Sequence, residues 1–234
     1  MTEKLYYKDS HLSEFTATVI DVKENAVILD KTAFFPEGGG QTADTGVIDG
    51  IKVLDVQIVN GEILHYLEKP IEKGKTVECK LDFEKRFYKM QNHSGEHIIS
   101  GLVHSLYGFN NVGFHLSDCE MTMDFDGVLN REDLLKVEKL ANEAIYKNAK
   151  FNCYFPESLE NLEYRSKLDL SEDVRIVEIE GYDRCACCAP HVDSASEIGI
   201  IKILDFCKNK GGVRLFEKCG YSALEDYNER YLND

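Results

Sequence analysis

The chain has 234 residues, of which 43% are hydrophobic and 29% are charged, a composition typical of a globular protein with one large domain or two modest ones. Its formal net charge of −15 excludes nucleic-acid binding through phosphate attraction over the whole surface, so any such contact needs a local basic patch. Residues 1–15 lack the apolar core of a signal peptide, and no apolar run approaches the roughly 20 residues that span a bilayer. We therefore expect a cytoplasmic protein without membrane contact, whose eight cysteines are reduced, buried or metal-bound.

The N-terminal third has the pattern of β structure. Short runs rich in β-branched residues are separated by NG, DG and KG turns, and their spacing favours a small barrel or a sandwich. Between the second and third runs lies the glycine-rich loop PEGGGQTADTG, residues 36–46. The predicted strands cover residues 14–22, 25–30, 51–59, 62–67 and 76–83.

From residue 83 the apolar period becomes that of a helix, and Gly108 is a suitable end for it. We place a domain boundary here, with one domain over 1–84 and a second over 85–234. The mixture of helices and antiparallel strands makes the second domain α+β. Its further predicted elements are strands at 112–117, 118–125 and 174–181, a helix at 131–148, a hairpin of 198–206 with 212–220, and a helix over the last dozen residues.

Two pairs of potential metal ligands have the same spacing. His93 and His97 are four residues apart on a predicted helix, so both imidazoles project from one face about a turn apart. Cys187 and His191 are also four apart and follow the predicted strand 174–181. Three imidazoles and a thiolate form a mixed nitrogen and sulfur set that suits zinc. The two pairs together therefore predict a single Zn²⁺ site.

The neighbours of these residues admit several interpretations. His104 is seven residues further along the helix, roughly 10 Å away, which excludes it from the same site. Asp183 could orient a ligand from behind. Cys185 and Cys188 compete with Cys187 for the role of thiolate, and each could instead be a small buried hydrophobe. A redox pair is a third interpretation, which we rank low because no CxxC opens a helix here.

These motifs resemble a known family. HSGEH (93–97) followed by CCAPHV (187–192) resembles the HxxxH and CxxxH pairs of the editing domain of alanyl-tRNA synthetase, which also occurs in the free-standing alanyl-tRNA editing proteins of the AlaX family. TAFFPEGGGQTADTG (32–46) resembles the glycine-rich loop of the family's N-terminal barrel. NNVGFHLSD (110–118) resembles the medium-length free-standing type, and residues 196–220 resemble the end of the second additional domain shared by threonyl- and alanyl-tRNA synthetases.

The resemblance implies an N-terminal β-barrel over 1–84 and an α+β zinc-binding editing domain over 85–234. The implied activity is that of a trans-editing hydrolase, which cleaves the ester of mischarged alanine tRNA without ATP and with serine favoured over glycine as the amino acid removed. The start of the chain just before the barrel implies a stand-alone protein. Phe35 stands where the family usually has Tyr, and Pro190 lies in a segment more often written CGGTH. The zinc ligands carried over are His93, His97, Cys187 and His191.

Three residues are candidates for catalysis or selection. Thr32 or Gln41 could hydrogen-bond the serine hydroxyl, which discriminates against alanine because alanine would leave that polar group unpaired. Glu96 could act as a general base on water, although its place on the helix could equally turn it to solvent. The loop glycines are expected to line the substrate, and the alternative is that they only form a tight turn. They are Gly38, Gly39 and Gly40.

For tRNA contact we predict Lys208, Lys210 and Arg214, which cluster beside flexible glycines and could hold phosphates of the acceptor end of alanine tRNA. An ordinary basic hairpin turn is the alternative. The oligomeric state, monomer or homodimer, stays open.

Two rival functions use the same residues. His93, Glu96 and His97 match H-x-x-E-H, the motif of an inverted zinc peptidase, but such a site has no place for Cys187 and His191. A zinc ion closed in by four ligands could instead stabilise a non-catalytic nucleic-acid-binding module. The same closed shell leaves open whether zinc in an editing enzyme is catalytic or a template.

Overall fold

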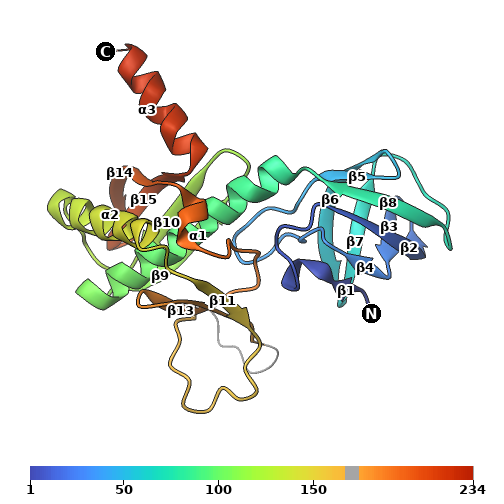
Figure 1. Ribbon diagram of the computed structural model, residues 1–234, viewed down its shortest axis with the longest axis horizontal. Helices are drawn as coiled ribbons and strands as arrows, with labels where there is room; N and C mark the ends of the chain where they lie inside the picture. Colours follow the sequence, from blue (N-terminus) through green and yellow to red (C-terminus); the bar gives the residue numbers. More distant parts are fainter. Residues whose placement is uncertain (167–173, 234) are drawn as a thin grey trace. The chain divides into compact units, whose positions relative to one another are not determined.

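The structure is a computed structural model that describes residues 1–166 and 174–233. It divides into two compact units, Met1–Phe87 and Tyr88–Asp234. Helix α1 (Phe83–Tyr107) runs through this division and through the boundary expected at 84/85, which stays a prediction (Figure 1). Within the described residues, no helix has the length and apolar character needed to cross a bilayer.

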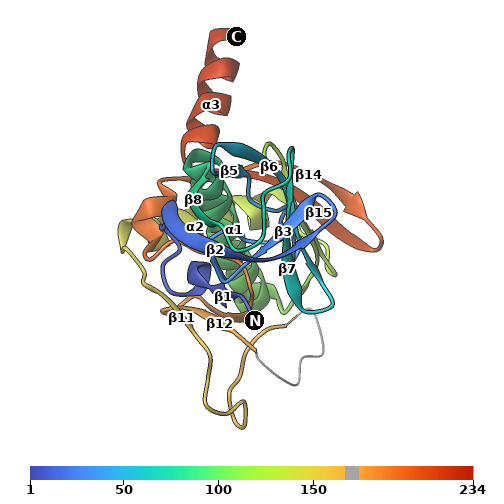
Figure 2. The ribbon, with the colours of Figure 1, turned by 90° about the vertical axis from the view of Figure 1, so that its right-hand side faces the viewer.

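The first unit is built on six antiparallel strands that close into a barrel in the order β2-β3-β7-β6-β5-β8 (Figures 1 and 2). Alternation along the strands places one face inside, as in β8, where Val77, Cys79 and Leu81 are buried. A parallel pair, β1 with β4, and the short 3₁₀ helix η1 complete the unit. The bounds are β1 Glu3–Lys4, η1 Leu5–Tyr7, β2 Glu14–Lys23, β3 Ala26–Leu29, β4 Lys31–Thr32, β5 Gly46–Ile48, β6 Ile51–Val59, β7 Glu62–Leu67 and β8 Thr76–Leu81.

The glycine-rich loop is organised by a turn and by a buried ion pair. Gly38 and Gln41 exchange two backbone hydrogen bonds of 3.1 Å, and the residues between them have φ of 61° and 85°, which favours glycine at both positions. Asp44 accepts a 2.7 Å hydrogen bond from the Phe35 amide and pairs with the buried guanidinium of Arg86. The tight turn considered as an alternative is therefore present, and contact of this loop with a substrate stays a prediction.

Thr32 is hydrogen-bonded inside the barrel. Its hydroxyl lies 2.8 Å from His65 Nε2 and accepts a 3.1 Å bond from the Phe34 amide. His65 Nδ1 lies 3.2 Å from the carbonyl oxygen of Val27, so Nδ1 carries the proton and Nε2 accepts from Thr32. The one proton of the Thr32 hydroxyl is thus used within the barrel, and its predicted role toward serine stays a prediction.

His65 is expected to make the protein less stable in acid. Burial lowers its pKa from 6.5 to about 4, so between these values the unfolded chain binds a proton that the folded chain does not. The contribution of neutral His65 is complete above pH 6.5 and is lost as the pH falls toward 4, by about 3 kcal/mol in all. Urea unfolding between pH 7 and 4.5 should show a shallower pH dependence for His65→Gln than for the wild type. Equal slopes would contradict this account.

The described residues of the second unit form two antiparallel sheets and, besides α1, three helical segments. One sheet has the strand order β14-β15-β10-β9 and the other β11-β12-β13. Helix α2 lies against β14, where the Asn142 side chain bonds both backbone groups of Ile201. The bounds are β9 Asn111–Leu116, β10 Met121–Phe125, α2 Arg131–Tyr146, β11 Phe151–Tyr154, β12 Ile176–Ile179, β13 Asp183–Ala186, η2 Ala195–Ile198, β14 Ile201–Asn209, β15 Gly212–Cys219 and α3 Tyr221–Asn233.

Several predicted boundaries of the second unit need correction. The helix expected at 131–148 begins at a capping box of Asn130 with Asp133 but ends at Tyr146, because Asn148 has a φ of 52°. The strand expected at 118–125 starts only at Met121, since Ser117 accepts hydrogen bonds from the backbone of the preceding turn. The short strands β11 and β13 are absent from the sequence-based prediction, as are β1, β4 and β5 of the first unit.

Candidate metal centre

Helix α1 presents the first ligand pair. It starts after Asp82, whose carbonyl accepts the amide of Arg86, and ends before Gly108, which has a φ of 72°. The ring centroids of His93 and His97 are 5.4 Å apart, and each residue is 2% exposed. The helical spacing therefore places both imidazoles on one buried face, as predicted.

The loop after β13 supplies the second pair, and Arg175 holds the shape of that loop. The Cys187 amide donates to the Arg175 carbonyl at 3.0 Å, while Arg175 Nη1 donates to the carbonyls of Cys187 and Ala189 at 3.0 and 2.9 Å. On the other side, Ser94 Oγ lies 3.0 Å from His191 Nδ1. The loop is thus fixed both by the residue that precedes the neighbouring strand β12 and by α1.

The two pairs meet at one point. Suitable donor atoms of His93, His97, Cys187 and His191 all lie within 4.8 Å of one another. Cys187 Sγ is 3.6 Å from His93 Nε2 and 3.4 Å from His191 Nε2. Zinc–sulfur and zinc–nitrogen bonds of about 2.3 and 2.0–2.1 Å at a tetrahedral angle give a sulfur–nitrogen separation of about 3.6 Å. These four residues could therefore hold one metal ion.

The donors are arranged to bind a cation. Burial raises the pKa of the Cys187 thiol well above its usual value. Burial also lowers the pKa of His191 well below its usual value, and the nearby His97 and His93 lower it further. A neutral imidazole has a lone pair to donate, and a coordinating thiol loses its proton to a bound metal. The protein supplies nitrogen and sulfur donors and leaves the positive charge to the ion.

Glu96 is buried beside this cluster and does not face solvent, the orientation considered as an alternative. It is 2% exposed, and its Oε1 accepts hydrogen bonds from Ser100 Oγ at 2.6 Å and from Asn111 Nδ2 at 2.5 Å. Its Oε2 lies 3.8 Å from His97 Nε2. The carboxylate is therefore held on one oxygen and directed toward the candidate ligands with the other.

Asp183 approaches α1 closely, behind His97. Its Oδ2 lies 3.4 Å from His97 Nδ1, and hydrogen bonds from His97 and Arg165 outweigh the effect of burial and lower the pKa of Asp183. The approach requires glycine at position 101, since a Cβ there would lie 2.4 Å from the Tyr182 carbonyl oxygen and 2.7 Å from Asp183 Cβ. Asp183 thus lies where the sequence suggested, behind a ligand.

Gly101→Ala is expected to destabilise the protein by about 2 kcal/mol, because the overlap outweighs the gain in helix propensity. The midpoint of urea unfolding measures this. Ser105→Ala, an exposed change on the same helix, is the matched control and should stay within about 0.5 kcal/mol of the wild type. An equally mild effect of Gly101→Ala would show that Asp183 does not pack against the helix as described.

A cavity of 460 Å³ lies beside residues that surround the cluster, and the four candidate ligands are not among its described lining residues. It shares Asn111 with the Glu96 network and Arg165 with the Asp183 pair, and Cys185 also lines it.

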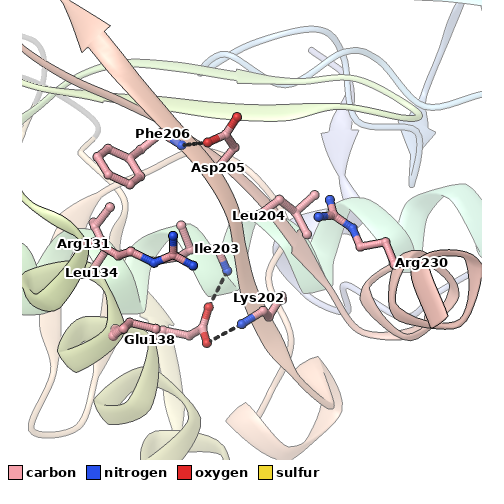
Figure 3. A pocket seen from close by; sticks show the side chains of 10 residues that line it. Arg131, Leu134, Glu138, Lys202, Ile203, Leu204, Asp205, Phe206 and Arg230 are labelled. Atoms are coloured by element: carbon pink, nitrogen blue, oxygen red, sulfur yellow. Dashed lines mark hydrogen bonds and ion pairs between the residues drawn. The ribbon is translucent and has the colours of Figure 1, made fainter. Parts of the chain in front are cut away.

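A second pocket, between α2 and β14, is organised differently (Figure 3). There Glu138 accepts hydrogen bonds from Lys202 and from the Ile203 amide, both 2.8 Å, so its carboxylate fastens the helix to the strand.

The predicted tRNA-contact residues lie on the β14–β15 hairpin. Lys208 and Lys210 are exposed, and the turn at Lys210 and the following glycine has φ of 43° and 88°, as in an ordinary type I′ hairpin. Arg214 differs, because its guanidinium pairs with both carboxylate oxygens of Asp124 at 2.7 Å. Contact with tRNA stays a prediction for all three residues.

Two family models match the chain. The model described as tRNA synthetases class II (A) matches residues 3–85, which cover the barrel. The model of the threonyl and alanyl tRNA synthetase second additional domain matches residues 174–217, which include Cys187 and His191. The second ligand pair of the candidate centre therefore lies in a segment that is similar to this second additional domain.

Curated relatives match nearly the whole chain. The alanyl-tRNA editing protein AlaX-L of Pyrococcus horikoshii is 36% identical over 245 residues, which cover 98% of this chain and 61% of that protein. Alanine–tRNA ligases are similar over a comparable share of the chain. That of Ignicoccus hospitalis is 36% identical over 91% of this chain, and that of Pyrococcus furiosus is 34% identical over 97%. The chain spans only 25% and 27% of these ligases. The medium-length subtype stays a prediction.

Proposed function

We propose that this chain binds one Zn²⁺ through His93, His97, Cys187 and His191 and hydrolyses the ester of alanine tRNA that carries the wrong amino acid. The observation that carries the proposal is the convergence of the two ligand pairs at one buried point, in a chain 36% identical to a protein named an alanyl-tRNA editing protein. The 460 Å³ cavity lined by Asn111, Arg165 and Cys185 is the space we assign to the aminoacyl end of the tRNA.

Bound zinc would act as a Lewis acid toward the ester carbonyl or as a template for the substrate. The chain's own residues would move the proton. Glu96 would accept a proton as water attacks the carbonyl carbon and would return it to the ribose oxygen as the ester bond breaks. Ser100 and Asn111 hold one oxygen of Glu96 and so direct the other. The products are the free amino acid and the uncharged tRNA.

Selection of the amino acid is assigned to the first unit. We propose that Thr32, Gln41 and the glycines Gly38 to Gly40 recognise serine, with glycine as a second substrate. The Thr32 hydroxyl gives its proton to His65 and accepts one bond from Phe34, so a second lone pair can accept the hydroxyl of a seryl group. Alanine has no hydroxyl to donate and would leave that lone pair unsatisfied.

For the tRNA itself we propose that Lys208 and Lys210, which are exposed at the hairpin tip, contact phosphates of the acceptor end. Arg214, which pairs with Asp124 and so supports the hairpin, is proposed as the third phosphate contact. With a net charge of −15, contact confined to such a patch favours rapid release.

The rival functions receive less support. A peptidase of the H-x-x-E-H type has no use for the Cys187 and His191 donors that lie beside His93 and His97. A purely structural zinc would leave Glu96 with no reason to be buried and directed at the ligands. A non-catalytic, zinc-stabilised nucleic-acid-binding module can be distinguished from an editing hydrolase only by measuring turnover.

The test is ester loss. Zinc-loaded protein is incubated with alanine tRNA charged with serine, glycine or alanine, and the aminoacyl ester remaining is followed over time. We expect acceleration with the seryl ester, weaker acceleration with the glycyl ester, and a spared alanyl ester. Seryl-charged serine tRNA is the matched control for recognition of the tRNA. Absence of acceleration with every ester would refute the proposal and favour the binding module.

A further inference from the structure

Arg165 is fastened to the strand that precedes the metal-binding loop. Its amide donates to the Arg184 carbonyl at 2.8 Å, and its carbonyl accepts the Ala186 amide at 2.9 Å. These bonds form a parallel bridge to Cys185 in β13. The backbone of Arg165 is therefore held on both sides of the residue, which sets the starting point of its side chain.

The Arg165 guanidinium donates two parallel hydrogen bonds to the Asp183 carboxylate. Nε donates to Oδ1 and Nη2 donates to Oδ2, both at 2.7 Å. The Asp183 side chain is 2% exposed and that of Arg165 is 15% exposed. A buried bidentate pair fixes the plane of the carboxylate as well as its position, which a lysine ammonium cannot do.

The fixed carboxylate faces a buried nitrogen of a candidate ligand. Asp183 Oδ2 lies 3.4 Å from His97 Nδ1, and within the part of the chain that the structure describes Nδ1 has no hydrogen-bond partner closer than this. The remaining ring nitrogen, Nε2, is then the one available to the cluster. A carboxylate behind a metal-bound histidine selects the Nδ1–H form, orients the ring and makes it a better donor.

We propose that Arg165 is a positioning residue for the metal: it holds Asp183 so that the carboxylate accepts Nδ1–H of His97 and Nε2 is presented to the ion. This inference rests on the proposed zinc site. It differs from the arrangement at His191, where the neutral hydroxyl of Ser94 lies at Nδ1. Without the guanidinium, the described residues leave the Asp183 carboxylate only the long contact to His97, and it could rotate away from it.

The test measures zinc affinity in the full chain, by competition with a chromophoric chelator and in the absence of tRNA. We expect Arg165→Gln and Asp183→Asn each to weaken zinc binding 10–100-fold, as is typical for groups behind a metal ligand. The double variant should lose little more than either single one, because both act through the same contact. Arg165→Lys, which keeps the charge but not the fork, should lose about tenfold.

The matched control is Arg184→Gln. Arg184 lies on the same sheet and pairs with Glu178, but both side chains of that pair are partly exposed and neither contacts the cluster in the described structure. Its zinc affinity should remain within about twofold of the wild type. An equal loss in Arg184→Gln would show general destabilisation and overturn the inference, as would unchanged affinity in Arg165→Gln and Arg165→Lys.

A second readout separates this inference from the proposed function. The absorption spectrum of the cobalt-substituted protein reports on the geometry of the ligands, and Arg165→Gln should alter its visible bands while thermal unfolding still shows a folded protein. If the wild type binds zinc tightly but hydrolyses no ester, the proposed function is refuted while the role of Arg165 in zinc binding remains supported. If the wild type is active but Arg165→Gln changes neither the cobalt spectrum nor the zinc affinity, only the inference about Arg165 is refuted.

Discussion

Replacing Cys187 with serine is expected to weaken zinc binding about 100-fold and to abolish ester hydrolysis. A site of four protein ligands binds zinc with an apparent free energy of about 10–16 kcal/mol, so the loss of one ligand removes about 3 kcal/mol. Cys187 is the sole sulfur in the four-residue group, and its Sγ lies within 3.6 Å of two imidazole nitrogens. Zinc content after dialysis and the rate of seryl-ester loss measure the two effects.

Cys188→Ser is the matched control, because Cys188 is the adjacent thiol with similar burial and does not belong to the four-residue group. It should retain both zinc and activity. The opposite pattern, with zinc retained in Cys187→Ser and lost in Cys188→Ser, would mean that the thiolate ligand is Cys188 and not Cys187. This experiment also decides the role of Cys188, which the sequence leaves open.

Glu96→Gln is expected to lower kcat by about 10²–10⁴ while zinc content stays unchanged. The amide has the same shape and its oxygen can still accept the hydrogen bonds of Ser100 and Asn111, but it cannot take a proton from water. Single-turnover hydrolysis of the seryl ester, with zinc content measured in the same sample, gives both quantities.

Glu217→Gln is the control for Glu96→Gln, since both are buried carboxyl groups of the same unit. Burial raises the pKa of Glu217 well above its usual value, and its contact with Cys219 opposes this only in part, so an amide is a conservative replacement there. We expect little change in rate. A full rate in Glu96→Gln would assign Glu96 a structural role and leave orientation of the substrate as the remaining contribution.

The secondary structure was predictable where a single period dominates. Apolar spacing gave α1 to within its last residue, and alternation gave β6 with its observed bounds, whereas the strand predicted at 198–206 lies three residues before the observed β14. The four-residue strand β13 escaped prediction because the run DRCA carries two charged residues whose partners, Arg165 and Glu178, neutralise them only in the folded chain. Short strands owe their existence to neighbours that the local sequence does not reveal.

The ligand pairs were predictable for the same reason, since a spacing of four residues is a local signal. Their supports were not. Ser94 lies 97 residues before the histidine it contacts, and Asn111 lies 15 residues after Glu96. Arg175 gives no local sign that it shapes the metal-binding loop. Such long-range hydrogen bonds depend on the register of the sheets, which spacing alone does not determine.

The basic hairpin shows a second limit of the sequence. Lys208, Lys210 and Arg214 form one cluster in the sequence, but Arg214 is engaged by Asp124, which lies on the neighbouring strand β10. A count of charges cannot distinguish a cation that awaits a phosphate from one that is already paired.

The most direct test of the metal centre is X-ray absorption at the zinc edge of the zinc-loaded protein. The account predicts a first shell of one sulfur at about 2.3 Å and nitrogen ligands at about 2.0–2.1 Å, and loss of the sulfur in Cys187→Ser. A shell with two sulfurs, or with none, would contradict the claim that three imidazoles and one thiolate meet at a single ion.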